Sequence, residues 1–161
     1  MLSFFFYGTL MDPDLQAVVL GGRLPAGIPA VLAGYRRRTV AGQDFPAIMP
    51  AEGSSVSGLL VDGIGPAMAA RASFYEGEQY TGAPVTAARD NGTDITAWTF
   101  LPTLGLHPGT GSWDLARWQR RHKARTLRFA RGAMARATVG DLRRIEAAWQ
   151  ALLRRKISPL P

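Results

Sequence analysis

The sequence begins with Leu2-Ser3-Phe4-Phe5-Phe6 and continues at once into Tyr7-Gly8-Thr9-Leu10. The first stretch is short and almost wholly apolar, which predicts a buried β-strand. It stops at a glycine followed by a hydroxyl residue, which predicts a tight turn at the carboxyl end of the strand. Backbone N–H groups in such a turn can hold an anionic group of a ligand. We therefore take this strand and its turn as the first candidate binding site.

The rest of the chain is rich in strand signals. Short apolar or alternating runs predict strands at residues 28–35, 36–40, 55–61, 84–88 and 93–100, with an extended piece at 46–50. Helices are expected after Asp12-Pro13-Asp14, over residues 66–74, from a Ser112 cap through Phe129, and after a capping box of Thr138 and Asp141. Strands and helices do not alternate regularly, which argues against a doubly wound parallel sheet. The order predicts an α+β fold, with a small mixed β-barrel or curved sheet and peripheral helices.

Length and composition predict one globular domain. The 161 residues are 47% hydrophobic and 19% charged, so we expect a single domain over 1–161, with a core at about 1–101 and a helical extension at about 112–157. The chain has no cysteine, which excludes disulfides and thiolate chemistry, and only two histidines, so no metal site is expected. The apolar start is too short to span a bilayer and lacks the basic region of a signal peptide, so we expect a cytoplasmic protein.

Positive charge is concentrated in the last third of the chain. The net charge is +7, but residues 113–161 carry 13 Lys and Arg against three acidic residues, a balance of +10. Such a segment could attract nucleic acid or an anionic membrane. The plainer interpretation is a solvated, arginine-rich helix face, and we favour it: no nucleic-acid partner is expected.

A second segment with chemical potential is Phe74-Tyr75-Glu76-Gly77-Glu78-Gln79-Tyr80. In it, one carboxylate follows two aromatic residues and precedes a glycine. A carboxylate in apolar surroundings, combined with a turn that holds anions, suits proton transfer on a small molecule. Taken singly, each segment also has a plain structural interpretation, as a strand-end turn and as a surface acid at a helix end.

Together the two segments resemble the γ-glutamylcyclotransferase-like, or AIG2-like, superfamily. Its members begin with an apolar strand running into Tyr-Gly-Ser/Thr, matched here by residues 5–11, and carry an aromatic-Glu-Gly-x-x-Tyr stretch, matched here by residues 75–80. Residues 29–35, 45–47 and 56–60 resemble the family's intervening strands, so the likeness covers roughly residues 3–101. The helical tail is similar to that of bacterial members.

The resemblance implies an enzyme that needs no metal or cofactor. In this family, the α-amine of a small γ-glutamyl compound attacks its own γ-carbonyl, releasing 5-oxoproline and a free amine or amino acid. The resemblance assigns Glu76 as the catalytic general acid and base, with substrate binding by Tyr7, Gly8, Thr9, Leu10 and Tyr80. Burial near Phe74 and Tyr75 would raise the pKa of the Glu76 carboxyl.

The chain departs from the family pattern at two places. Many members have an aspartate shortly before the glutamate, where this sequence has Ala72-Ser73, and a tyrosine at the end of the last strand, where it has Phe100. These differences bear on the substrate more than on the reaction class. A non-catalytic small-molecule binder on the same scaffold is the alternative hypothesis. The sequence sets neither the amine part of the substrate nor the oligomeric state.

Overall fold

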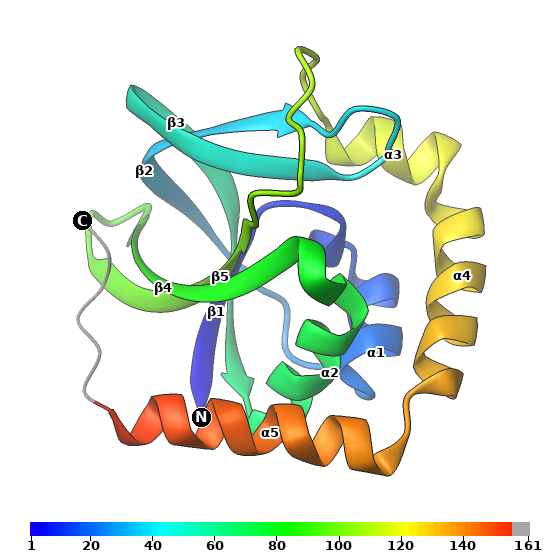
Figure 1. Ribbon diagram of the computed structural model, residues 1–161. Helices are drawn as coiled ribbons and strands as arrows, with labels where there is room; N and C mark the ends of the chain where they lie inside the picture. The colour runs from blue at the N-terminus through cyan, green and yellow to red at the C-terminus, as the bar shows by residue number, and fades with distance from the viewer. Residues whose placement is uncertain (156–161) are drawn as a thin grey trace.

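The computed structural model describes residues 1–155. Within these residues, five strands close into a barrel in the order β1-β3-β2-β4-β5 (Figure 1). The strands are β1 (Leu2–Phe6), β2 (Ile28–Thr39), β3 (Pro46–Ile64), β4 (Tyr80–Arg89) and β5 (Asp94–Pro102). All neighbours pair antiparallel except β1 and β5, which run parallel where Phe4 faces Trp98. The expected α+β fold with a small mixed barrel is confirmed.

Helices surround the barrel on two sides. They are α1 (Pro13–Leu20), α2 (Pro66–Glu76), α3 (Leu115–Arg121), α4 (Lys123–Arg136) and α5 (Val139–Arg154), with short 3-10 turns at Thr9–Met11 and Gly77–Gln79. Figure 1 shows α4 running alongside α1 and α2, while α5 crosses the end of the barrel near the N-terminus. None of these helices is long and apolar enough to cross a membrane. The last residues of the expected extension, 156 and 157, lie outside the described part of the chain.

Strand β1 is apolar on both faces because both faces are buried. Phe5 and Tyr7 point into the barrel, where they pack with residues such as Ile48 and Leu60. Phe4 and Phe6 point the other way, into a second core that the helices cover. A strand buried on both sides loses the polar alternation of a surface strand, which explains the continuous apolar run at the start of the chain.

Two pairs of expected strands are in fact single long strands. The structure joins residues 28–35 and 36–40 into β2, and residues 46–50 and 55–61 into β3. Their pairing runs from Ile28–Leu60 to Thr39–Pro46 and shifts register once, around Gly34. Gly34 has a φ of +79°, which glycine adopts without strain, so the chain forms an irregularity here within a continuous ladder and not a strand end.

The expectation of one helix from Ser112 to Phe129 was wrong. Asp114 caps α3 by accepting a hydrogen bond from the Arg117 N–H, and the helix ends at His122, where α4 begins. No proline or glycine marks this break in the sequence. The caps at Asp12 and Thr138 are confirmed, because each side chain accepts hydrogen bonds from its own first turn.

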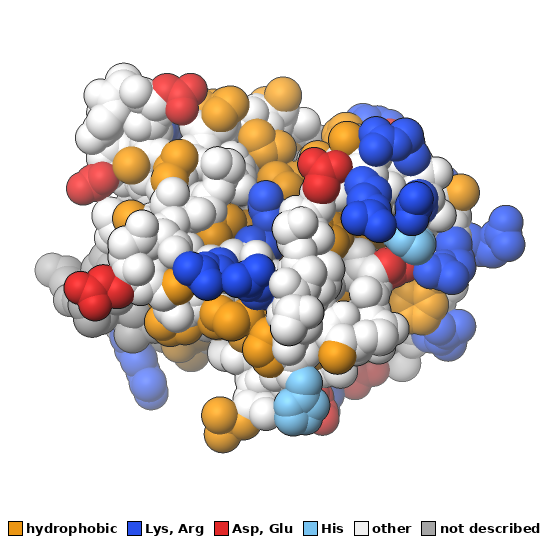
Figure 2. Space-filling view, turned by 90° about the horizontal axis from the view of Figure 1, so that it is seen from above, with side chains coloured by type: hydrophobic (Ala, Val, Ile, Leu, Met, Phe, Trp, Pro, Cys, Tyr) orange, Lys and Arg blue, Asp and Glu red, His pale blue; other side chains and the backbone are white. Residues whose placement is uncertain are grey.

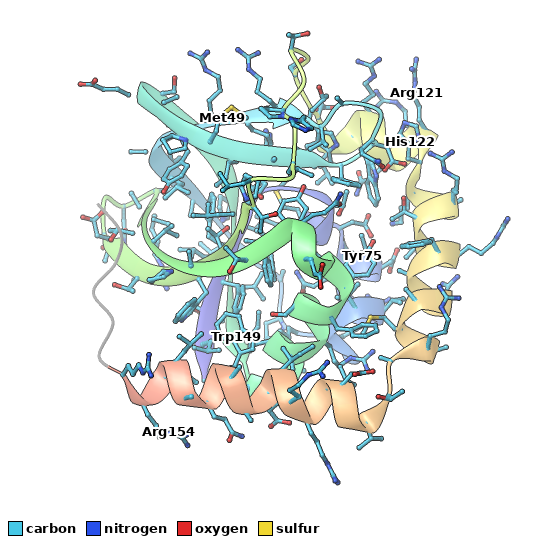
Figure 3. The ribbon with its side chains drawn as sticks, in the orientation of Figure 1. Met49, Tyr75, Arg121, His122, Trp149 and Arg154 are labelled. Atoms are coloured by element: carbon cyan, nitrogen blue, oxygen red, sulfur yellow. The ribbon has the colours of Figure 1, made fainter. Side chains whose placement is uncertain are left out.

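The helices after residue 112 pack against the barrel through tryptophans. Trp118 and Trp149 are buried, and Leu127 and Ile145 pack against the same core. Trp149 points from α5 towards the barrel (Figure 3) and contacts Trp98 edge-on, with ring centroids 4.8 Å apart. Leu153, expected on the same apolar face, is exposed. The inward packing of the tryptophans is therefore as expected.

Candidate active site

The carboxyl end of β1 opens into the expected turn. Gly8 leaves the strand, and Thr9–Met11 form a single 3-10 turn that leads to the Asp12 cap of α1. Among residues 1–155, the N–H groups of Gly8, Thr9 and Leu10 donate to no other group. Unpaired N–H groups that converge at one turn favour an anionic or carbonyl oxygen. This turn, residues 7–10, is called the cradle below.

The cradle forms one wall of a cavity of about 440 Å³, a size typical of small-molecule sites. Glu76 and Tyr80 line the same cavity, so the structure brings together all six residues assigned from the sequence. Glu78 does not line it. Other parts of the wall come from β1, β5, the start of β3 and the loop before it, the end of α2 and the 3-10 turn after it, and α4. These residues are Phe5, Phe6, Gln43, Asp44, Phe45, Pro46, Tyr75, Gln79, Thr99, Phe100, Arg125, Thr126 and Phe129.

Glu76 is the last residue of α2 and is half-buried at the cavity wall. The helix stops there because Gly77 takes a φ of +68°, a conformation that favours glycine. The Glu76 carboxylate receives no hydrogen bond and forms no ion pair within residues 1–155. Its removal from water raises its pKa to about 7. The negative end of the helix dipole lies at the same position and also disfavours the ionised form.

Two tyrosines that line the cavity are fixed by hydrogen bonds to backbone carbonyls. The Tyr7 hydroxyl donates to the Phe100 carbonyl at 2.6 Å, and the Tyr80 hydroxyl donates to the Pro46 carbonyl at 2.8 Å. Burial and then the neighbouring ionisable groups, Glu76 among them, raise the pKa of both phenols, which therefore remain protonated. Glu76 is thus the one cavity-lining group within residues 1–155 whose raised pKa falls near neutrality.

The two departures noted in the sequence have defined structural roles. Phe100 is one of the residues that line the cavity, its ring packs against Phe4 with centroids 5.6 Å apart, and its carbonyl receives the Tyr7 hydroxyl. Ser73 accepts a hydrogen bond of 2.9 Å from the indole of Trp149, which connects α2 to α5. Its hydroxyl therefore supports the helix that carries Glu76 and does not line the cavity.

Sequence reasoning missed the outer part of the cavity. Arg125, Thr126 and Phe129 of α4 line it together with the loop that contains Asp44 and Phe45. These residues are far apart in the sequence, and no local motif connects them. The sequence offered one signal, which is that Phe129 is an aromatic residue in a strongly basic stretch. In the structure its side chain is 62% exposed.

Asp44 connects this loop to the helical extension. Its carboxylate lies 2.8 Å from Arg125 Nη2 and 3.6 Å from His122 Nδ1, and its carbonyl receives the indole N–H of Trp113 at 2.9 Å. Figure 3 shows His122 at the junction of α3 and α4, and Tyr75 at the end of α2 on the side of α4. The outer rim of the cavity is therefore built jointly by the barrel and the extension.

No group of three or more His, Asp or Glu side chains gathers as a metal site within the described chain. The charged residues that line the cavity are Asp44, Glu76 and Arg125. These side chains suit an organic ligand with both polar and apolar parts.

Comparison with known proteins identifies the family. A family model described as "Gamma-glutamyl cyclotransferase, AIG2-like" matches residues 4–120. The chain belongs to this family. The resemblance inferred over residues 3–101 is thereby confirmed, and the matched stretch reaches further, into α3.

Relatives and solved structures agree with this AIG2-like assignment. "Protein AIG2 C" of Arabidopsis thaliana is 30% identical over 117 residues, which is 71% of this chain and 70% of the relative. The solution structure of another Arabidopsis thaliana protein superposes with a TM-score of 0.62 at 27% identity, covering 80% of this chain and 87% of its own. A structure titled "Gamma-glutamyl cyclotransferase" has the same fold, with a TM-score of 0.55 at 14% identity over 99% of this chain and 89% of its own.

Proposed function

We propose that this AIG2-like protein is a γ-glutamylcyclotransferase-type enzyme that converts a γ-glutamyl amine or γ-glutamyl amino acid into 5-oxoproline and the free amine. The observation that carries the proposal is the Glu76 carboxylate, which lines the cavity without a partner among residues 1–155 and whose pKa burial raises to about 7. A general acid–base group works best when its pKa lies near the working pH. The family assignment supports the same reaction class.

The reaction needs proton transfer at two nitrogens. The α-ammonium group of the substrate must lose a proton before its nitrogen can attack the γ-carbonyl carbon. As the new C–N bond closes the five-membered ring, the attacking nitrogen gives up a second proton and becomes the lactam N–H. The old amide C–N bond breaks, the departing nitrogen takes up one proton to leave as the amine, and the released amine takes up the second as it becomes an ammonium ion. The Glu76 carboxylate accepts the first proton and returns it to the leaving nitrogen, so that the residue ends the cycle in its starting state.

The cradle supplies the complementary part of the site. Gly8, Thr9 and Leu10 line the cavity together with Glu76, and their N–H groups have no acceptor among residues 1–155. In the proposal they hold an oxygen of the substrate, either its α-carboxylate or the oxyanion that develops on the γ-carbonyl. Preorganised donors at such an oxygen are commonly worth about 10²–10³ in rate. In the proposal, Tyr7 and Tyr80, which also line the cavity, contact the glutamyl part of the substrate.

The test is a screen of γ-glutamyl compounds for release of 5-oxoproline, with Glu76→Gln and Glu78→Gln as a matched pair. Glutamine keeps the shape of the side chain but cannot exchange a proton. Glu76→Gln should therefore lower kcat by about 10²–10⁴-fold or more, with little change in binding. Glu78 lies outside the cavity, so Glu78→Gln should be nearly silent. Equal losses in both variants would reject Glu76 as the acid–base group. No turnover by the unaltered protein would instead favour a binding protein on this scaffold.

A further inference from the structure

Helix α4 contributes a wall to the cavity that the family match does not include. The match ends at residue 120, whereas Arg125, Thr126 and Phe129 line the cavity from beyond it. Glu76 and the cradle already account for the glutamyl part of a substrate. The α4 wall therefore faces whatever is attached to the γ-carbonyl, which is the group that leaves.

The α4 wall carries an exposed aromatic ring. Phe129 is 62% exposed although it lines the cavity, and Phe45 lines the cavity from the loop before β3. Phe45 is supported from below by an edge-on contact with Tyr80, with centroids 6.1 Å apart. Covering such a ring with an apolar ligand group removes its surface from water, which favours binding.

The same wall carries a cation that can accept an anionic group. Arg125 donates through Nη2 alone, to Asp44 at 2.8 Å and towards His122 Nδ1 at 3.3 Å. Its Nε and Nη1 hydrogens have no acceptor among residues 1–155. A guanidinium presents five N–H donors, so Arg125 can hold Asp44 and a carboxylate at the same time.

Charge at the rim disfavours a cationic leaving group. The Asp44 carboxylate already forms an ion pair with Arg125 and lies 3.6 Å from His122. Figure 2 shows Lys and Arg side chains gathered at one end of the face seen from above, on the side where Figure 1 places α3. An additional ammonium group at this rim would meet like charge and would find its carboxylate partner occupied.

We propose that the leaving group is an α-amino acid with a bulky apolar side chain and a free carboxylate, recognised by Phe129 and Arg125 of α4. This inference rests on the proposed function and names the part of the substrate that the function leaves open. Arg125 and Phe129 are specificity-determining residues here, because the bond-making steps are assigned to Glu76 and the cradle. Polyamine conjugates, whose leaving group carries an ammonium, are poor substrates on the same grounds.

The experiment compares kcat/KM for four substrates: γ-glutamyl-phenylalanine, its C-terminal amide, γ-glutamyl-alanine and γ-glutamyl-putrescine. The amide removes the carboxylate, alanine removes the ring, and putrescine supplies a cation. We expect γ-glutamyl-phenylalanine to exceed each of the others by about tenfold or more, the usual scale for one charge-assisted hydrogen bond or one buried apolar group. A putrescine conjugate that matches or exceeds it would overturn the inference.

Variants then assign each preference to its residue. Arg125→Gln should abolish the preference for the acid over the amide, while Arg125→Lys should retain part of it. Arg128→Gln, an exposed arginine three residues further along α4, is the matched control and should change nothing. Phe129→Ala should remove the preference for phenylalanine over alanine, with Val139→Ala, an exposed apolar residue of α5, as its control. Unchanged ratios in Arg125→Gln and Phe129→Ala would reject the α4 wall as the source of specificity.

A binding measurement separates failure of this inference from failure of the proposed function. The same four ligands are titrated calorimetrically into Glu76→Gln, in which turnover is expected to be too slow to consume the ligand during the titration. The same order of affinity without turnover by the unaltered protein would reject catalysis and retain the recognition. Turnover of all four substrates at similar rates would retain catalysis and reject the recognition.

Discussion

The indole N–H of Trp149 donates a 2.9 Å hydrogen bond to the hydroxyl of Ser73. Ser73 lies one helical turn before Glu76 on α2, and Trp149 is buried on α5. Helix α5 thus supports α2, the helix that carries the candidate acid–base group Glu76. The same ring lies against Gly82 of β4, where a Cβ atom would come within 2.7 Å of it.

Trp149→Ala should lower the free energy of unfolding by about 3–5 kcal/mol, because it removes a large buried ring and leaves a cavity between α5 and the barrel. Urea denaturation followed by circular dichroism measures this. Trp149→Phe keeps most of the apolar contact and loses only the hydrogen bond to Ser73, so it should cost less. An unchanged transition in Trp149→Ala would mean that α5 does not pack on the barrel.

Gly8→Val should weaken ligand binding at the cradle by about tenfold or more. The φ of Gly8 is −125°, which other residues adopt, so the obstacle is space: a Cβ atom would lie 3.0 Å from the Pro46 ring. Gly105→Val, at an exposed loop glycine with nothing within 4 Å of its Cβ position, is the control. Calorimetric titration with a substrate into variants that also carry Glu76→Gln gives the affinities. Full affinity in the Gly8 variant would contradict the role of the cradle.

Glu76→Gln should make the folded protein more stable at pH 8 and leave it unchanged near pH 4. Burial raises the pKa of Glu76 to about 7 in the folded state, well above its ordinary value. Folding therefore favours the protonated form of Glu76. The stability that this protonated form provides is fully present below the unfolded pKa and is lost as the pH rises through the folded pKa, whereas glutamine stays neutral throughout. The gain should reach at most about 3 kcal/mol above pH 7. Thermal melts across this range measure it, and a gain of the same size at pH 4 would show that the charge is not the cause.

The pH dependence of kcat/KM should show an acidic limb. Glu76 must be ionised to accept the proton of the substrate ammonium, so activity should rise with a slope of one up to about pH 7 and then level off. Initial rates of 5-oxoproline release between pH 5 and 9 give the profile. A limb centred near pH 4.5 would indicate a carboxylate in ordinary contact with water.

Lys123→Met should destabilise the protein at neutral pH by about 1–3 kcal/mol, because the buried Asp12 carboxylate loses one charged partner and keeps its other hydrogen bonds. Asp12 is fully buried, which by itself would raise its pKa, but hydrogen bonds from Lys123, the Leu15 N–H and Gln119 bring the pKa below its usual value. The stabilisation from this pairing is fully present above the pKa of Asp12 in the unfolded chain. It disappears as the pH falls through the lower pKa of Asp12 in the folded protein. The effect of Lys123→Met, followed by urea titration, should shrink accordingly in acid, whereas Arg128→Met should be neutral throughout.

Local chemistry in the sequence was sufficient for much of this structure. The apolar run of β1 ends where the glycine suggested, and Asp12 and Thr138 cap the helices that they precede. The aromatic-Glu-Gly stretch ends α2 and places Glu76 at the cavity wall. Each of these features depends on neighbours within a few residues, which is why a single sequence reveals it.

Features that depend on distant partners were not visible in the sequence. The sequence predicted separate strands at residues 28–35 and 36–40 and separate pieces at 46–50 and 55–61, but pairing along the β2–β3 ladder continues across both boundaries. The helix break at His122 has no local signal, and it lies beside Lys123, which pairs with Asp12 and Asp14 at 2.8 Å. The α4 wall was missed for the same reason, since Phe129 meets the cavity only through the tertiary fold.

The pairing of Lys123 with Asp12 also sets an order of events during synthesis. Asp12 follows the cradle directly, whereas Gln119, which also binds its carboxylate, comes 107 residues later. The ribosome therefore releases the cradle long before it makes the side chains that hold the buried Asp12. Until α3 and α4 emerge, a nascent chain with a nearly complete barrel holds the Asp12 carboxylate only through the N–H groups of Asp14 and Leu15, next to the candidate site. The contacts that hold the Asp12 carboxylate are thus completed late, and we expect the turn at the candidate site to be fixed only after α3 and α4 have been made.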